Sequence, residues 1–196
     1  MSTPTTADDT TYPHKLNPAD TTGLMHWSIY GRRGNPSTTR ATASSWQYKP
    51  FSKPVTQPWD HVIPYSELPK LLHGFVPGEM EDKWFVYADG PDAQGNAAVH
   101  FYRSWTGFYM VEAKLVMEVD EKGEVREKDA RFTEITWETD RERYNGDMDA
   151  QGTVLAVAEW CMMCQLRPET STSEDDKAEE PGSKQGEADD APDGTT

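Results

Sequence analysis

Apolar and polar residues alternate along the middle of the chain, a pattern typical of β-strands with one face toward solvent. The clearest alternation, over 130–138, predicts an antiparallel strand with Phe132 and Glu134 on one face and Ile135 on the other. Three other stretches are rich in aromatic and β-branched residues. These stretches predict strands over 83–88, 97–102 and 108–119.

A different periodicity follows the last strand, where apolar residues recur every three or four positions, as on one face of a helix. The residues of this stripe are Leu155, Ala158, Met162 and Leu166. We expect the helix to span about 153–166, because Gly152 disfavours an earlier start and Pro168 prevents continuation. A shorter helix is expected over 66–74, where Gly74 can end it.

These elements predict an α+β domain in which an antiparallel meander of about four strands is covered on one face by the C-terminal amphipathic helix. The chain has 196 residues, and this domain is expected to occupy 58–167. The segment 168–196 holds ten acidic and two basic residues and no Val, Ile, Leu, Met or aromatic residue. Such a segment cannot bury enough apolar surface to offset its ordering entropy, so it is expected to be a disordered acidic tail.

The segment 1–57 is dense in Thr, Ser and Pro, and it is expected to be largely disordered or extended. Within it, the apolar run 24–30 predicts a short strand. Trp46, Tyr48 and Phe51 are spaced along a stretch that prolines interrupt. These three rings are candidates to anchor the stretch across the surface of the domain.

Charge and composition limit the possible partners. The formal net charge of -15 disfavours nucleic acid as a default ligand, because binding phosphates needs a basic face. No run approaches the ~18 consecutive apolar residues of a membrane span. The first residues also lack the basic and apolar regions of a secretory signal. We therefore expect a cytoplasmic protein without a membrane partner, and the sequence also allows a nuclear location.

The densest group of polar and aromatic residues lies in the turn between the second and third predicted strands. An arginine beside an aromatic ring suits a planar anion, and here Arg103 lies close to Trp105 in the sequence. Ser104 and Thr106 add hydroxyl donors. The same residues also fit a structural turn in which Arg103 bonds backbone carbonyls and Trp105 packs in the core. In either case Gly107 is expected to adopt a backbone conformation that other residues disfavour.

The candidate ligand-binding residues are His100, Arg103, Ser104, Trp105, Thr106, Asp140 and Arg141. No catalytic residue is assigned: Ser104 and His100, for example, would lie about 13 Å apart on an extended strand, too far for a nucleophile and its base. Cys161 and Cys164 have CxxC spacing but lack a second pair of zinc ligands, and they lie toward the end of a helix. They are therefore expected to be small core residues, and no metal or cofactor is expected.

Two segments carry a family resemblance: EMEDKWFVY at 79–87 and HFYRSWTGF at 100–108. Over about 79–166 the chain resembles a family of small, uncharacterised, mostly bacterial proteins with the pattern MEDKWF(I/V)(Y/F) … (F)HRSWTG. This chain departs from the pattern where Phe101 and Tyr102 separate His100 from Arg103, so the His-Arg adjacency of the family is lost. The resemblance implies membership and no particular activity.

These observations favour a non-enzymatic binding or protein-interaction module, whose partner is a protein or a small anionic ligand. The alternative is a small enzyme or ligand-binding domain that acts on a phosphorylated or nucleotide-like anion through the Arg-Ser-Trp-Thr-Gly turn. A pocket where Arg103, Trp105 and a carboxylate such as Asp140 converge would favour the enzyme. A flat, exposed aromatic patch would favour the binding module.

Overall fold

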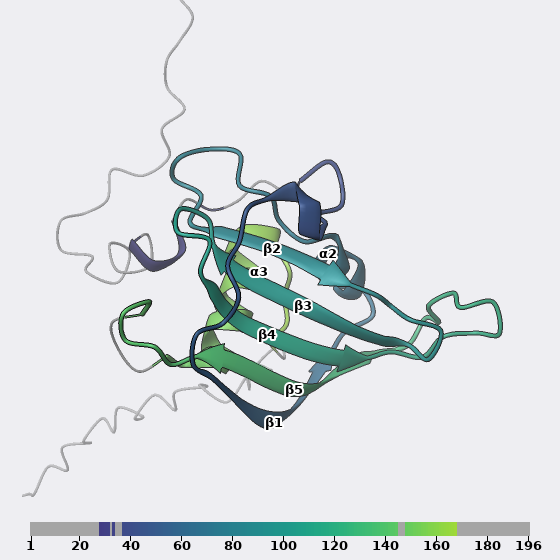
Figure 1. Ribbon diagram of the computed structural model, residues 1–196. Coiled ribbons are helices and arrows are strands. Elements are labelled where there is room, and N and C mark those ends of the chain that lie inside the picture. The colour runs from purple at the N-terminus through teal and green to yellow at the C-terminus, as the bar shows by residue number, and fades with distance from the viewer. Residues whose placement is uncertain (1–27, 32, 34–36, 145–147, 168–196) are drawn as a thin grey trace, which may run out of the picture.

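Five strands form one antiparallel sheet in the order β1–β5–β4–β3–β2 (Figure 1). The computed structural model describes residues 28–31, 33, 37–144 and 148–167. The strands are β1 (Pro54–Ile63), β2 (Trp84–Asp89), β3 (Asn96–Arg103), β4 (Tyr109–Val116) and β5 (Ala130–Glu138). The last four follow one another as a meander, and β1 pairs with β5 to form an edge of the sheet. The predicted α+β class and antiparallel meander are confirmed.

The sheet has five strands, whereas the sequence pattern predicted about four. The strand that the pattern did not predict is β1. This strand begins inside the segment that was expected to precede the domain, and it contains Pro54 and Pro58. Proline lacks an N–H group for the ladder and is tolerated mainly on edge strands and at bulges. β1 fits both conditions, since it lies at the edge and its pairing shifts between Pro58 and His61.

Helices α2 (Leu68–His73) and α3 (Ala150–Met162) cover one face of the sheet, behind it in Figure 1. α2 ends at Gly74 as predicted. α3 begins before Gly152 because an Asp149 oxygen accepts the Gly152 N–H at 2.9 Å, which caps the helix one turn earlier than expected. The predicted end at Leu166 is wrong, because Met163 adopts a left-handed backbone with φ +52° and ends the helix at Met162. No helix in the described part of the chain is both long and apolar enough to cross a membrane.

Two expectations concern the ends of the chain. In the run 24–30, the described residues Ser28, Ile29 and Tyr30 form a helical turn, so the predicted strand is wrong for this part. The remainder of that run lies outside the described residues, as does the acidic segment 168–196 that was expected to be disordered.

The main core lies between the sheet and the two helices. Its largest buried side chains include Trp84, Phe101, Met110, Leu115, Phe132 and Ile135. The expected alternation in β5 put Phe132 and Ile135 on opposite faces, but the structure turns both toward this core. The reason is a bulge, since the β4–β5 register shifts between Lys114 and Leu115, where Thr133 is the extra residue.

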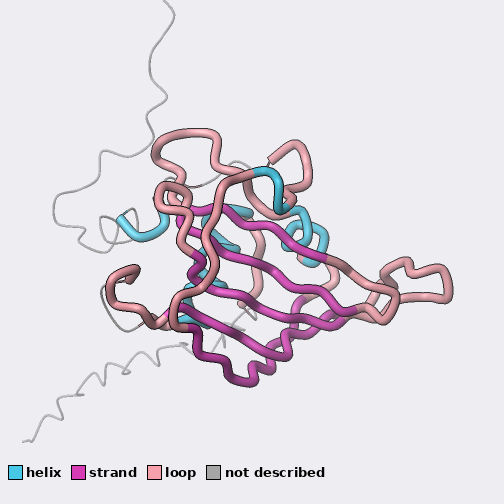
Figure 2. The backbone as a smooth tube through the Cα atoms, viewed as in Figure 1, coloured by secondary structure: helices cyan, strands magenta, loops and turns pink. Residues whose placement is uncertain are grey.

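The opposite face of the sheet carries a second, aromatic cluster formed by Ala41, Phe85, Tyr87, Tyr102 and Tyr109. Residues 37–53, here called the strap, cross this face in front of the strands and include the short helix η1 (Ala43–Ser45) (Figures 1 and 2). Three strap rings lie on the cluster, with centroid distances of 6.5 Å for Trp46–Phe85, 4.7 Å for Tyr48–Tyr102 and 3.8 Å for Phe51–Tyr109. The molecule therefore has three layers: helices, sheet and strap.

Candidate functional site

The Arg-Ser-Trp-Thr-Gly turn connects β3 to β4 and lies directly beneath the strap. The turn is closed by the Gly107 N–H, which donates to the Arg103 carbonyl at 2.8 Å. Gly107 has φ +68°, as predicted, and a Cβ added there would lie only 3.0 Å from the Gln47 carbonyl oxygen. Glycine at this position therefore permits both the turn and the close passage of the strap.

The strap and the turn enclose a groove of about 700 Å³. Its lining residues are Ser44, Ser45, Trp46, Gln47, Tyr48, Lys49, Ser104, Trp105, Thr106 and Gly107. Two hydrogen bonds join the walls: Trp46 Nε1 donates to the Ser104 carbonyl, and the Lys49 N–H donates to the Gly107 carbonyl, both at 2.8 Å. None of the lining residues is acidic, although the chain has a net charge of -15.

Trp105 is 65% exposed, so the expectation that it packs in the core is wrong. Ser104 takes the inward position instead, where its hydroxyl donates to the Asp82 carbonyl at 2.6 Å. Trp105 Nε1 donates to the Met80 carbonyl at 2.9 Å, and Lys83 Nζ lies 4.4 Å from the ring centroid. These contacts hold the exposed ring in a defined position.

Two strap rings extend this exposed surface on the other wall of the groove. Trp46 is 36% exposed and Tyr48 is 43% exposed, while their inner surfaces pack on the aromatic cluster of the sheet. We call Trp46, Tyr48 and Trp105 the aromatic patch. Both indole N–H groups of the patch are already bonded to backbone carbonyls, so the rings offer mainly their apolar surfaces to a partner.

Arg103 is directed away from this groove. Its Nη1 donates to the Ile29 carbonyl at 2.8 Å, and its guanidinium carbon lies 4.9 Å from the centroid of the Trp84 ring. Burial lowers the pKa of the Arg103 guanidinium. These contacts give Arg103 the fixed backbone acceptor that the structural interpretation of the turn required.

Asp140 and Arg141 also lie apart from the groove lining. Asp140 accepts a hydrogen bond from the Ser52 hydroxyl at 2.7 Å and one from Lys53 Nζ at 3.2 Å. These bonds lower the pKa of Asp140 to about 2. Arg141 follows in an exposed turn. Asp140 thus bonds the end of the strap and does not pair with Arg103.

His100 lies under the strap, in a buried polar network on the outer face of the sheet. Its Nε2 is 3.0 Å from an Asp89 carboxylate oxygen, and its Nδ1 contacts the Tyr109 hydroxyl. That hydroxyl donates to Glu112 at 2.6 Å. His100, whose Nδ1 also lies 3.5 Å from a Glu112 carboxylate oxygen, lowers the pKa of Glu112, and burial raises the pKa of Tyr109. His100 does not line the groove, although it lies beneath the layer that forms one wall.

Of the predicted site residues, the structure therefore brings Ser104, Trp105 and Thr106 to one groove and places His100, Arg103, Asp140 and Arg141 elsewhere. The strap half of the groove was missed. Trp46 and Tyr48 had been noted as anchors, but nothing in their local sequence indicates which part of the sheet they reach.

The two cysteines lie within the core. Cys161 and Cys164 are buried and free, and burial raises the pKa of both thiols to about 12. This environment fits small core residues and opposes thiolate chemistry. Over the described ranges, no group of three or more His, Cys, Asp or Glu side chains is placed to hold a metal ion.

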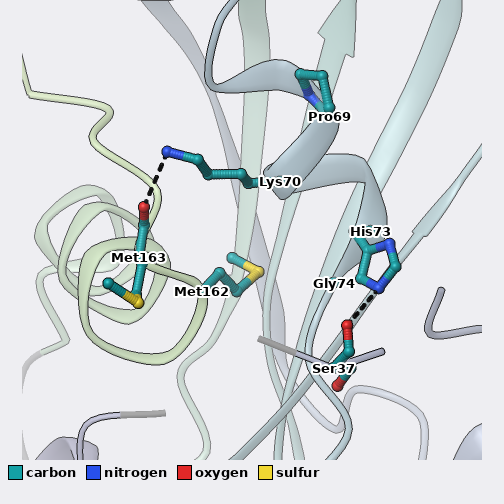
Figure 3. Close-up of a pocket in the computed structure, with 7 residues that line it drawn as sticks. All are labelled: Ser37, Pro69, Lys70, His73, Gly74, Met162 and Met163. Carbon is teal, nitrogen blue, oxygen red and sulfur yellow. Dashed lines mark hydrogen bonds between the residues drawn. The ribbon is translucent and has the colours of Figure 1, made fainter. Parts of the chain in front are cut away.

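A second cavity, of about 460 Å³, lies between α2, the end of α3 and the strap (Figure 3). Its polar groups bond across its walls: Lys70 Nζ donates to the Met163 carbonyl at 3.2 Å, and His73 Nε2 lies 2.7 Å from the Ser37 carbonyl (Figure 3). These side chains brace neighbouring segments, and none of the predicted site residues lines this cavity.

Comparison with known proteins found no family model that matches the chain, no similar curated protein and no similar solved structure.

Proposed function

We propose that the protein is a binding module that engages a partner protein through the groove between the strap and the turn. The observation that carries this proposal is the aromatic patch, in which three exposed rings line one groove in fixed positions. Trp and Tyr dominate the energetics of protein interfaces. Rings that are already held in place lose little conformational entropy when a partner binds.

The surroundings of the groove support binding rather than catalysis. General acid–base chemistry most often uses an imidazole or a carboxylate, and the lining of this groove contains neither. Arg103 bonds the Ile29 carbonyl, and Asp140 bonds the strap. The convergence of Arg103, Trp105 and a carboxylate that would favour an enzyme is therefore not seen among these residues.

A small anionic ligand is a second candidate for the same groove. The absence of acidic residues from the lining favours it, together with Lys49 in the lining and Lys83 beside Trp105. The hydroxyls of Ser44, Ser45 and Thr106 would supply further donors.

A peptide-display experiment tests the main proposal. Peptides selected by the wild-type chain from a random library are expected to bind the Trp105→Ala variant at least about tenfold more weakly, because an interface anchor is lost. Trp105→Phe, which keeps a ring, is expected to retain most of the affinity. Fluorescence titration with a synthetic copy of each selected peptide measures these changes.

Val62→Ala is the matched control, because Val62 is also an exposed apolar residue but lies on β1, away from the groove. Equal binding by wild type and Trp105→Ala would contradict the proposal. Thermal stabilisation by inorganic phosphate or AMP that Lys49→Gln abolishes would favour the anionic ligand instead.

A further inference from the structure

The hydrogen bonds around His100 restrict where the protons of this network can lie. Tyr109 has one hydroxyl proton, and it donates that proton to Glu112 at 2.6 Å. The Tyr109 oxygen must then accept from His100 Nδ1. His100 Nε2 faces the Asp89 carboxylate at 3.0 Å, and an ionised carboxylate can only accept. With Tyr109 donating to Glu112, these contacts are therefore satisfied together only when both ring nitrogens of His100 carry a proton.

The orientation of Tyr109 connects this network to the strap. Its ring stacks on Phe51 of the strap, with centroids 3.8 Å apart and ring planes 11° from parallel. Phe51 lies between Lys49, whose N–H bonds the Gly107 carbonyl, and Ser52, whose N–H bonds Glu138. The Tyr109 side chain thus contacts His100 through its hydroxyl and the strap through its ring, which stacks on Phe51.

Titratable or charged groups reach this network from every neighbouring element. They are Asp89 and Tyr87 from β2, Tyr102 from β3, Tyr109, Glu112 and Lys114 from β4, and Arg40 and Tyr48 from the strap. Arg40 bonds the Ala88 and Gly90 carbonyls on either side of Asp89, and Lys114 pairs with Glu134. Imidazole is the side-chain type in this set that exchanges a proton near neutral pH.

We propose that the proton on His100 is a latch that holds the strap in place and thereby regulates the groove. Loss of the proton leaves one of the two bonds, to Asp89 or to Tyr109, without a donor, and it leaves the two carboxylates unneutralised. Tyr109 then loses its fixed orientation and the strap loosens. Because the closed state contains the proton, closure is favoured at low pH and weakens as pH rises. The role in partner binding rests on the proposed function, whereas the motion of the strap does not.

Amide hydrogen exchange of the full chain tests the latch directly. The protection factor of the Lys49 amide, divided by that of the Val86 amide, is expected to be about tenfold lower at pH 8 than at pH 5.5, the scale of one charged hydrogen bond. The Val86 amide is the reference, because it donates to the Phe75 carbonyl rather than to the strap. Nitrogen chemical shifts of His100 should show both ring nitrogens protonated at pH 5.5.

Three variants separate the latch from a general loss of packing. In His100→Gln, the ratio of the Lys49 to the Val86 protection factor is expected to be as low as in the wild type at pH 8 and to stay the same at both pH values. Tyr109→Phe keeps the stacking on Phe51 without the hydroxyl, so its ratio should also be independent of pH. His61→Gln, on the helix side of the sheet, should keep the wild-type dependence. A wild-type ratio that does not change with pH, or a Tyr109→Phe variant that responds like wild type, would overturn the latch.

The affinity of a selected peptide at the two pH values separates this inference from the proposed function. Weaker binding at pH 8 in the wild type, but not in Tyr109→Phe, would support regulation of the groove. A strap that responds to pH while peptide affinity stays constant would overturn that regulation. If no peptide loses affinity on substitution of Trp105, the proposed function is wrong. The ratio of the Lys49 and Val86 protection factors still tests whether His100 holds the strap.

Discussion

Replacing Glu138 with alanine is expected to lower the free energy of unfolding by about 3–5 kcal/mol, the cost of breaking a buried, hydrogen-bonded charge site. The Glu138 side chain is fully buried. Its carboxylate accepts N–H bonds from Ser52 and Lys53 of the strap at 2.7 and 2.8 Å, and from Thr139 and Asp140 at 3.1 and 3.0 Å. Arg143 adds a charged bond at 3.2 Å. Removal of the carboxylate leaves all of these donors without this acceptor.

Glu134 on the same strand provides the control, because its ion pair with Lys114 is exposed and worth about 0–1 kcal/mol. Urea denaturation of Glu138→Ala and Glu134→Ala at pH 7 makes the comparison. Similar losses in both variants would show that the buried carboxylate has no special role.

The effect of Glu138 should also depend on pH. Burial alone would raise the pKa of Glu138, but the donors from Ser52, Asp140 and Lys53 outweigh it and lower the pKa. A lowered pKa means that the stabilisation is complete above the ordinary value of 4.5 and is lost as pH falls through the folded value. The difference in free energy of unfolding between the wild type and Glu138→Ala should therefore be smaller at pH 3 than at pH 7.

Substitution of Gly107 by alanine is expected to cost about 2–3 kcal/mol and to displace the strap. Left-handed backbone at a residue with a Cβ costs about 1–2 kcal/mol. The remainder comes from crowding, because the new Cβ would lie 3.0 Å from the Gln47 oxygen and 3.2 Å from the Tyr48 Cα. Both neighbours are strap backbone, which gives way only if the strap moves.

Gly123 separates the two contributions. It has φ +80°, but a Cβ added there meets nothing within 4 Å, so Gly123→Ala should show the backbone strain alone. Thermal unfolding measures the stabilities, and exchange of the Lys49 amide reports the strap. If Gly107→Ala and Gly123→Ala lose equal stability and the Lys49 amide stays protected in Gly107→Ala, the strap backbone does not crowd Gly107 and this prediction is wrong.

The meander and its covering helix were predictable because their signals are local. Alternation over β5 and the apolar stripe of α3 each occupy one continuous stretch of sequence. β1 gave no such signal, since Pro54 and Pro58 interrupt it and its partner β5 lies far along the chain. The register of β5 was also hidden, because a bulge depends on how two strands pair rather than on either sequence alone.

The candidate site was predictable only in part, for a similar reason. The turn residues Ser104, Trp105 and Thr106 are neighbours in sequence, so their grouping was visible. The contribution of Trp46 and Tyr48 arises from a contact between distant segments. Trp105 was expected inside because large rings usually are, but the smaller Ser104 fills the inward position and bonds the Asp82 carbonyl.

The two edges of the sheet determine how a partner can approach it. Along β2, the Phe75 backbone already exchanges hydrogen bonds with Val86 at 2.8 and 2.9 Å. Along β1, Pro54 and Pro58 offer no N–H groups, and the bulge after Pro58 distorts the edge. Such edges are poor templates for strand addition, the mode in which many sheet proteins recruit peptides through main-chain pairing. The partner binding proposed above would therefore depend on contacts with side chains, and it would select a partner by its side chains rather than by an extended backbone.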